Sequence, residues 1–176
     1  MDFAALIAAF LAWSGGVIGT FGYAGIFLVS MLSTATILFP APGFLFIVAA
    51  GTVSSLNPWI IALVSGAGMT IGELTGYALG RGGTRALDKG KMLDKGKQKW
   101  LKRGEGWFRK GRGFLFIFIF AATPLPDDVT GILGGMFNYD IKKFMLATFL
   151  GKVLMNLVLV FAGATGAGIF TGTLSA

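Results

Sequence analysis

The sequence predicts an all-α integral membrane protein whose helices cross or enter the bilayer along most of the chain. Apolar residues fill 55% of the 176 positions and the mean hydropathy is +0.76, whereas soluble domains contain roughly 45–50% apolar residues. Charged residues make up only 13%, too few to cover the surface of a soluble domain. The length indicates a single membrane domain over residues 1–176.

The residue types that are missing exclude several classes of function. The chain has no cysteine and no histidine, so disulfides and thiolate chemistry are excluded, and the usual catalytic base and the commonest metal ligand are missing. We therefore expect no enzymatic activity, no metal and no cofactor.

Three apolar stretches, residues 16–36, 59–80 and 141–170, are long enough to cross about 30 Å of hydrocarbon as helices. Residues 3–13 are interpreted as a short helix in or near the interface, because the N-terminal segment lacks the positive charge of a signal peptide. Within 59–80, glycines recur every four residues and predict a helix face that admits a neighbouring backbone. These are Gly68, Gly72, Gly76 and Gly80.

Two further apolar segments, residues 36–57 and 113–138, are interrupted by prolines, which end helices because they remove backbone donors and restrict the preceding residue. In lipid, non-helical backbone survives only where protein or water covers it. Each segment is therefore either a broken span or a re-entrant hairpin with its tip near mid-membrane, and we favour the hairpin. The predicted tips are Pro40, Pro42 and Gly43 in the first segment, and Pro124 and Pro126 in the second.

Charge favours the hairpins and sets the orientation. Residues 81–112 contain 12 of the 15 basic residues and carry a net charge of +9, which indicates a cytoplasmic loop rather than a nucleic-acid surface. A re-entrant second segment keeps Lys142 and Lys143 in the cytoplasm, whereas a full span would place them outside. We expect a multi-pass plasma (inner) membrane protein with a cytoplasmic N-terminus and an outer C-terminus. Trp100 and Trp107, seven residues apart in the basic loop, predict an amphipathic helix on an anionic leaflet.

The two halves of the chain resemble each other. A shift of 84 residues places Pro40 on Pro124, Pro42 on Pro126 and Gly51 on Gly135. Broken segments in corresponding positions are typical of inverted-repeat transporters. The sequence therefore predicts repeats at about 16–80 and 113–170, with the two hairpins opposed.

Ionisable residues within the apolar segments are the candidate transport site. Asp127 and Asp128 follow Pro126; one can cap the returning half-helix, but burying a second carboxylate costs at least ~2.5–3.5 kcal/mol. Lys152 lies near the predicted midplane, too deep to reach an interface easily, and we expect Asp127 or Asp128 to be its partner. Glu73 is a candidate proton acceptor, or a carboxylate that reaches the interface.

Three further polar residues are assigned supporting roles. Tyr77 and Asn156 lie about one turn from the ionisable groups and can form inter-helix hydrogen bonds. Arg81 is expected to close the second span, where a cation favours the helix C-terminus.

These residues resemble the DedA/VTT membrane protein superfamily, which includes the SNARE-associated Golgi-type proteins. The resemblance runs from about residue 22 to 166. The matching pieces are Pro40-Ala41-Pro42-Gly43, Ala49-Ala50-Gly51, the Gly72–Arg81 run with its Gly-acid, Tyr and Gly-Arg pairs, Pro124, Gly135-Met136, Phe144 and Gly151.

The chain departs from the common bacterial pattern of this superfamily at three positions. Phe44 replaces an acid, while Ala121 and Asp127 replace arginines. The resemblance implies opposed re-entrant hairpins and movement of lipids, polyprenyl phosphates in bacteria and phospholipids in eukaryotes. Loss of the arginines puts a phosphate ligand at those positions in doubt, and Lys152 is a hypothetical replacement.

The leading functional prediction is a translocator of a lipid or polyprenyl-phosphate carrier, linked to protons or Na⁺ through the buried acids. Its expected partners are the bilayer and an anionic lipid or lipid-linked phosphate, not nucleic acid, and a homo-oligomer is compatible with the sequence. Two alternatives are a proton-coupled exporter of small cationic compounds and a non-transporting membrane scaffold.

Overall fold

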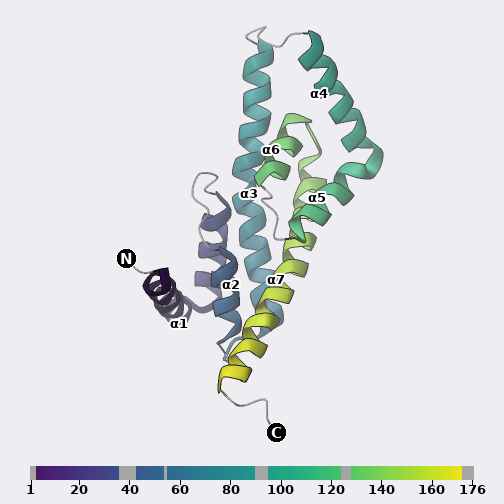
Figure 1. The fold of residues 1–176 in the computed structure, drawn as a ribbon. Helices are drawn as coiled ribbons and strands as arrows, with labels where there is room; N and C mark the ends of the chain where they lie inside the picture. The colour runs from purple at the N-terminus through teal and green to yellow at the C-terminus, as the bar shows by residue number, and fades with distance from the viewer. Residues whose placement is uncertain (1–2, 36–42, 54, 90–94, 124–127, 172–176) are drawn as a thin grey trace.

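The structure, a computed structural model, describes residues 3–35, 43–53, 55–89, 95–123 and 128–171. Within these ranges every regular element is a helix and no strand is present, as predicted. The elements are α1 (Phe3–Ala35), α2 (Gly43–Gly51), α3 (Pro58–Lys89), α4 (Lys95–Trp107), the π-helical turn η1 (Phe108–Arg112), α5 (Gly113–Ala121), α6 (Asp128–Met136) and α7 (Ile141–Thr171). Figure 1 shows α3 and α7 as two long rods, with α1 and α2 to their left and α4 and α5 to their right.

Among the described residues, three helices are long and apolar enough to cross a membrane, as the sequence predicts: Ala12–Ala35 in α1, Pro58–Ala86 in α3 and Ile141–Gly166 in α7. The long helices α3 and α7 contact each other directly. Residues that advance along α3 meet residues that retreat along α7, so the two helices are antiparallel.

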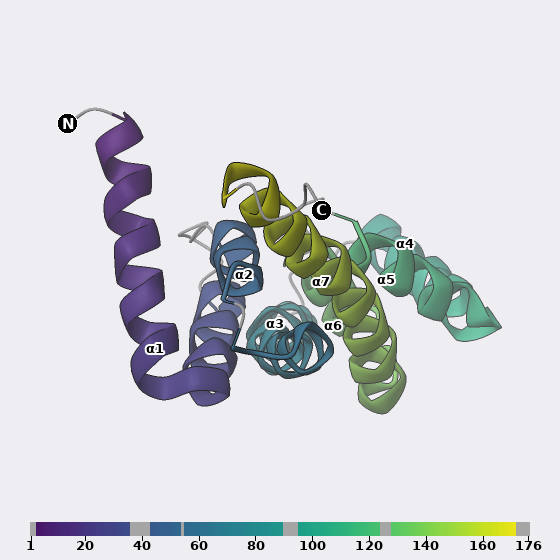
Figure 2. The ribbon, with the colours of Figure 1, turned by 90° about the horizontal axis from the view of Figure 1, so that it is seen from below.

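Helix α1 is bent in a way that was not predicted. A separate helix over 3–13 was expected, but the break between the two helical parts of α1 lies at Gly22, with φ 54° and ψ −130°. Residues with a side chain rarely adopt this backbone conformation, so glycine is required at this position. The part before the bend runs crosswise to α3, whereas the part after it runs beside α3 (Figures 1 and 2).

The two proline-interrupted segments contain short helices. α2, α5 and α6 have nine residues each, about 14 Å of helix at 1.5 Å per residue, so none of them crosses about 30 Å of hydrocarbon alone. Helix α2 packs against α1 and α7, while α6 packs against α3 and α5.

Glycines allow these helices to approach each other closely. A Cβ added at Gly68 would lie 2.4 Å from Phe27 O of α1, and a Cβ at Gly135 or Gly51 would fall equally close to a carbonyl oxygen of α3 or α7. The prediction that the glycine face of α3 admits neighbouring backbone is therefore confirmed, with α1 against one part and α6 against another. Each such contact requires the absence of a side chain.

The basic segment differs from the predicted loop in one respect. Helix α3 continues to Lys89 and its candidate span to Ala86. Arg81 therefore lies inside the helix, and the predicted role at its C-terminus is wrong. The predicted helix in this segment is present as α4. Trp100 and Trp107 are 54% and 40% exposed, while Trp100 also packs on Phe137, with ring centroids 5.2 Å apart.

Candidate functional site

Two facing stripes of buried residues run along α3 and α7. Every fourth residue from Ile61 to Tyr77 is at most 3% exposed, and every fourth residue from Phe144 to Val160 is at most 1% exposed. Because residues four apart lie on one face of a helix, each series forms a continuous stripe. The polar members are Ser65, Glu73 and Tyr77 on α3, and Thr148, Lys152 and Asn156 on α7.

An ion pair joins the two stripes. Lys152 Nζ lies 3.2 Å from Glu73 Oε1, and neither side chain is more than 2% exposed. Removing each ion from water costs several kcal/mol, which the attraction offsets only when the geometry is good. A buried pair of this kind contributes little net stability, so it is a candidate for function rather than a device for holding the helices together.

Polar atoms without partners lie one turn away on either side of Lys152. Asn156 donates from Nδ2 to Ser65 Oγ at 2.7 Å, but among the described residues neither its Oδ1 nor Thr148 Oγ1 has a hydrogen-bond partner. Both residues are fully buried, and an unsatisfied buried polar group costs about 1–3 kcal/mol. The face of α7 around Lys152 therefore offers unused hydrogen-bonding capacity in the protein interior.

The structure brings together Glu73, Lys152 and Asn156, which the sequence had assigned separately. The expected partner of Lys152 was Asp127 or Asp128, and its partner in the described part of the chain is Glu73. Asp127 lies outside the described residues, and of Asp128 only the backbone is described, as the first residue of α6.

The predicted hairpin tips are largely outside the described residues, namely Pro40, Pro42, Pro124 and Pro126. Gly43 is described and begins α2. A Cβ added at Gly43 would lie 2.9 Å from Ser33 Oγ, so this glycine allows α2 to start against α1.

A second polar group continues the α3 stripe beyond the ion pair. Tyr77 donates its hydroxyl hydrogen to the carbonyl oxygen of Tyr139 at 2.5 Å. Arg81 in turn donates from Nη1 to the Tyr77 hydroxyl oxygen at 3.3 Å. Glu73, Tyr77 and Arg81 are spaced by four residues, so this line covers about 12 Å of α3.

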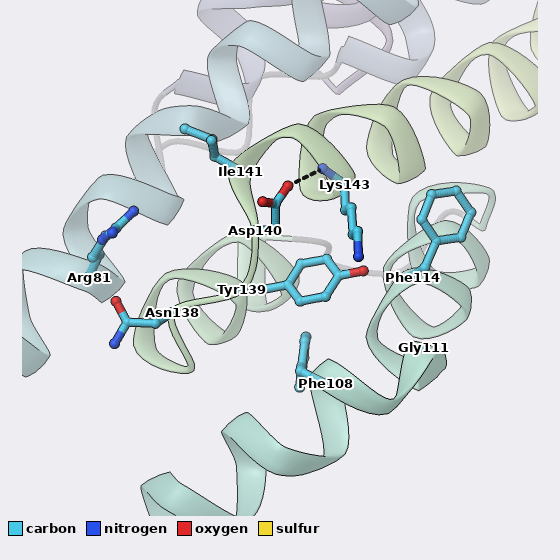
Figure 3. A pocket seen from close by; sticks show the side chains of 9 residues that line it. All are labelled: Arg81, Phe108, Gly111, Phe114, Asn138, Tyr139, Asp140, Ile141 and Lys143. Atoms are coloured by element: carbon cyan, nitrogen blue, oxygen red, sulfur yellow. Dashed lines mark hydrogen bonds between the residues drawn. The ribbon is translucent and has the colours of Figure 1, made fainter.

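The line ends at a pocket of about 810 Å³ between α3, η1, α5 and the start of α7 (Figure 3). Its lining residues include Arg81, Phe108, Asn138, Tyr139, Asp140 and Lys143. Asp140 Oδ1 accepts a hydrogen bond from the backbone N–H of Lys143 at 3.0 Å, which makes Asp140 the N-cap of α7.

Tyr139 lines the same pocket, and its side chain is buried. Burial, and secondarily the negative charge of Asp140, raise the pKa of Tyr139 above the ordinary value of 10.0. The phenol therefore stays neutral and can donate a hydrogen bond over the whole physiological range.

Sequence reasoning missed Ser65, Tyr139 and the pocket. The spacing of Ser65, Glu73, Tyr77 and Arg81 by multiples of four residues was the signal for one face of α3. The side of the pocket that α7 contributes had no comparable signal, because it depends on how the turn before α7 packs against η1.

The described residues contain no cluster of three or more Asp and Glu side chains that could hold a metal ion. The VTT domain matches residues 39–165, which include the ion pair and the pocket. This chain belongs to the VTT-domain, or DedA, family of membrane proteins.

Two relatives are similar to this VTT-domain protein over most of its length. A Methanocaldococcus jannaschii protein described as uncharacterized is 29% identical over 140 residues, covering 80% of this chain and 82% of its own length. A Lactococcus lactis subsp. lactis protein named alkaline phosphatase-like is 30% identical over 158 residues, covering 84% and 72%. That name describes the lactococcal protein, and it assigns no activity to this chain. No solved structure matches the chain.

Proposed function

We propose that this VTT-domain protein translocates a lipid or a polyprenyl-phosphate carrier across the plasma membrane. The observation that carries the proposal is the Glu73–Lys152 pair, buried between two long helices with unsatisfied polar atoms beside it. An ammonium group at this depth can donate to a phosphate oxygen, and Glu73 holds it in place when no phosphate is bound. When the cargo enters, its phosphate would replace Glu73 as the partner of Lys152.

Such an exchange gives a direct route to coupling with protons or Na⁺. A proton or a sodium ion on Glu73 removes most of its attraction for Lys152, which becomes free to bind an anionic headgroup. Asp127 and Asp128 remain proposed members of the same path. Coupling through Glu73 predicts that translocation responds to a pH or Na⁺ gradient in wild type and not in Glu73→Gln.

The proposal includes two opposed re-entrant hairpins and an inverted repeat. Support comes from reciprocal packing: α2, in the first half, packs through Gly51 on α7, and α6, in the second half, packs through Gly135 on α3. The two glycines are 84 residues apart, the shift that relates the halves in the sequence. The basic segment 81–112 would face the cytoplasm.

An exporter of cationic compounds is less favoured. Lys152 neutralises Glu73, so this site gives a cation no advantage over an anion. A non-transporting scaffold would have no need for a buried ion pair, which costs free energy to desolvate.

The test is translocation of labelled phospholipid and labelled polyprenyl phosphate in proteoliposomes. We expect activity for wild type and for Lys142→Gln, an exposed lysine near the start of α7, and at least a tenfold loss for Lys152→Met and Glu73→Gln, equivalent to about 1.4 kcal/mol. Inert wild type toward both lipids, or full activity of both pair variants, would contradict the proposal. Cysteines introduced near residues 40 and 124 of this cysteine-free chain would test the hairpins, since each tip should react from one side only.

A further inference from the structure

The pocket at the end of α3's polar line contains the positively charged side chain of Arg81, which is only partly hydrogen-bonded within the described part of the chain. Arg81 donates from Nη1 to Tyr77, but among the described residues its buried Nε has no hydrogen-bond partner. A buried guanidinium N–H without an acceptor is costly. Arg81 lines the pocket, so its guanidinium group can interact with an anionic ligand bound there.

The opposite wall supplies a second cation. Lys143 is exposed at the first turn of α7 and lines the pocket together with Asp140 and Tyr139, which lie between it and Arg81 in Figure 3. The lining thus holds two fixed positive charges and one negative charge, a net charge of +1. One oxygen of Asp140 is already engaged as the N-cap of α7.

This net charge discriminates among phosphate ligands. A phosphodiester carries a charge of −1 and matches the lining, whereas a phosphomonoester carries about −1.5 to −2 and leaves an excess of negative charge. Arg81 supplies the planar, forked donors that suit two phosphate oxygens. The Asn138 amide, at the rim, can contact glycerol hydroxyls or ester oxygens.

The remaining lining is apolar and suits the chains of a lipid. Phe108 and Phe114 form an aromatic wall, and the exposed Trp107 packs edge-on against Phe108 next to it. Aromatic rings at this position are typical of the boundary between headgroups and acyl chains. A soluble phosphate ester would leave this wall uncovered.

We propose that the pocket lined by Arg81, Lys143 and Phe108 binds the phosphodiester headgroup of a membrane glycerophospholipid at the cytoplasmic face. The assignment rests on the proposed function for its biological meaning, because it names the cargo that waits about 12 Å along α3 from the Glu73–Lys152 pair. The binding itself can be measured without translocation.

The experiment measures binding by the purified full chain in detergent to four probes. These are dihexanoyl phosphatidylglycerol, its deacylated headgroup glycerophosphoglycerol, dihexanoyl phosphatidic acid as a monoester, and inorganic phosphate. We expect the phosphatidylglycerol probe to bind most tightly, at least tenfold above the others, a difference of about 1.4 kcal/mol.

Variants locate the site. Lys143→Gln changes an exposed residue, so it should fold, and together with Arg81→Gln it should weaken phosphatidylglycerol binding about tenfold, or 1.4 kcal/mol. The matched control Lys142→Gln, also exposed but outside the pocket lining, should change binding by less than about twofold, within the scatter of surface charge effects. Equal effects of Lys143→Gln and Lys142→Gln would overturn the assignment.

The probes distinguish the sources of the phosphate. Equal binding of the deacylated headgroup or of inorganic phosphate would replace a lipid by a soluble ligand, and tighter binding of phosphatidic acid would refute the phosphodiester; either result overturns the proposal. Glu73→Gln should keep phosphatidylglycerol binding while losing translocation. Translocation without pocket binding therefore refutes this inference alone, and pocket binding without translocation refutes the proposed function alone.

Discussion

Replacing Lys152 by methionine removes one charge of the buried pair while keeping a side chain of similar length. Neither partner is more than 2% exposed, so in the variant Glu73 must either stay charged without its partner or take up a proton. Breaking a buried pair in this way costs about 3–5 kcal/mol. At about 2–4 °C per kcal/mol for a chain of this size, the melting temperature should fall by roughly 6–20 °C.

The double variant separates the cost of an orphaned charge from the worth of the pair. Glu73→Gln with Lys152→Met contains no buried ion, and replacing a whole buried pair by neutral groups is often neutral or stabilising by about 1–4 kcal/mol. Its melting temperature should return to near wild type, or above it, while translocation stays lost. The second substitution would then restore stability without restoring translocation.

The assay is thermal unfolding of purified protein in one detergent, followed by intrinsic fluorescence, with Lys142→Met as the matched control because Lys142 is exposed. We expect the control to lie within about 0.5 kcal/mol of wild type. The reasoning is refuted if Lys152→Met is no less stable than Lys142→Met, or if the two pair substitutions add without any recovery.

Three further predictions concern packing, hydrogen bonding and pH. Gly51→Ala would place a Cβ 2.2 Å from Val160 O and should destabilise the protein by about 1–3 kcal/mol in thermal unfolding in detergent. Gly166→Ala, with open space around it, should instead stabilise the protein by roughly 0.5–1 kcal/mol. Equal effects of the two substitutions would contradict the α2–α7 contact. Asn156→Leu should reduce the stability by no more than about 0.6–1.7 kcal/mol, the range for hydrogen bonds between membrane helices, and should also reduce translocation. A loss of stability without a loss of translocation would show that Asn156 has only a structural role. Because the pKa of Tyr139 is raised in the folded protein, the phenol of the unfolded protein ionises first as the pH rises, so stability should fall above about pH 10. Tyr139→Phe should make this alkaline loss of stability smaller. An unchanged dependence of stability on pH would contradict the burial argument.

The sequence predicts the helical spans well because their signal is local. The predicted 141–170 span differs from α7 by one residue at its C-terminal end, and the glycine spacing on α3 predicts close packing on the correct face. Both follow from composition and from the period of a helix, which do not depend on distant parts of the chain.

The pairing of charges could not be predicted in the same way. Asp127 or Asp128 was the predicted partner of Lys152, yet Glu73 is its partner in the described part of the chain. Which carboxylate meets Lys152 depends on the register in which α3 crosses α7. That register is set by contacts such as Gly66 against Val153 and Tyr77 against Phe144, which no single helix encodes.

The bend in α1 has a consequence for how many times the chain traverses the bilayer. Straightened, Ala12–Ala35 would be a rod of about 36 Å, ample for about 30 Å of hydrocarbon. With the bend at Gly22, only the 13 residues after it, about 20 Å of helix, run beside α3. The segment before the bend runs crosswise to α3. The backbone conformation of Gly22 therefore decides on which side of the membrane the first residues lie, and whether the chain crosses the membrane an odd or an even number of times. Any other residue at this position would strain the backbone.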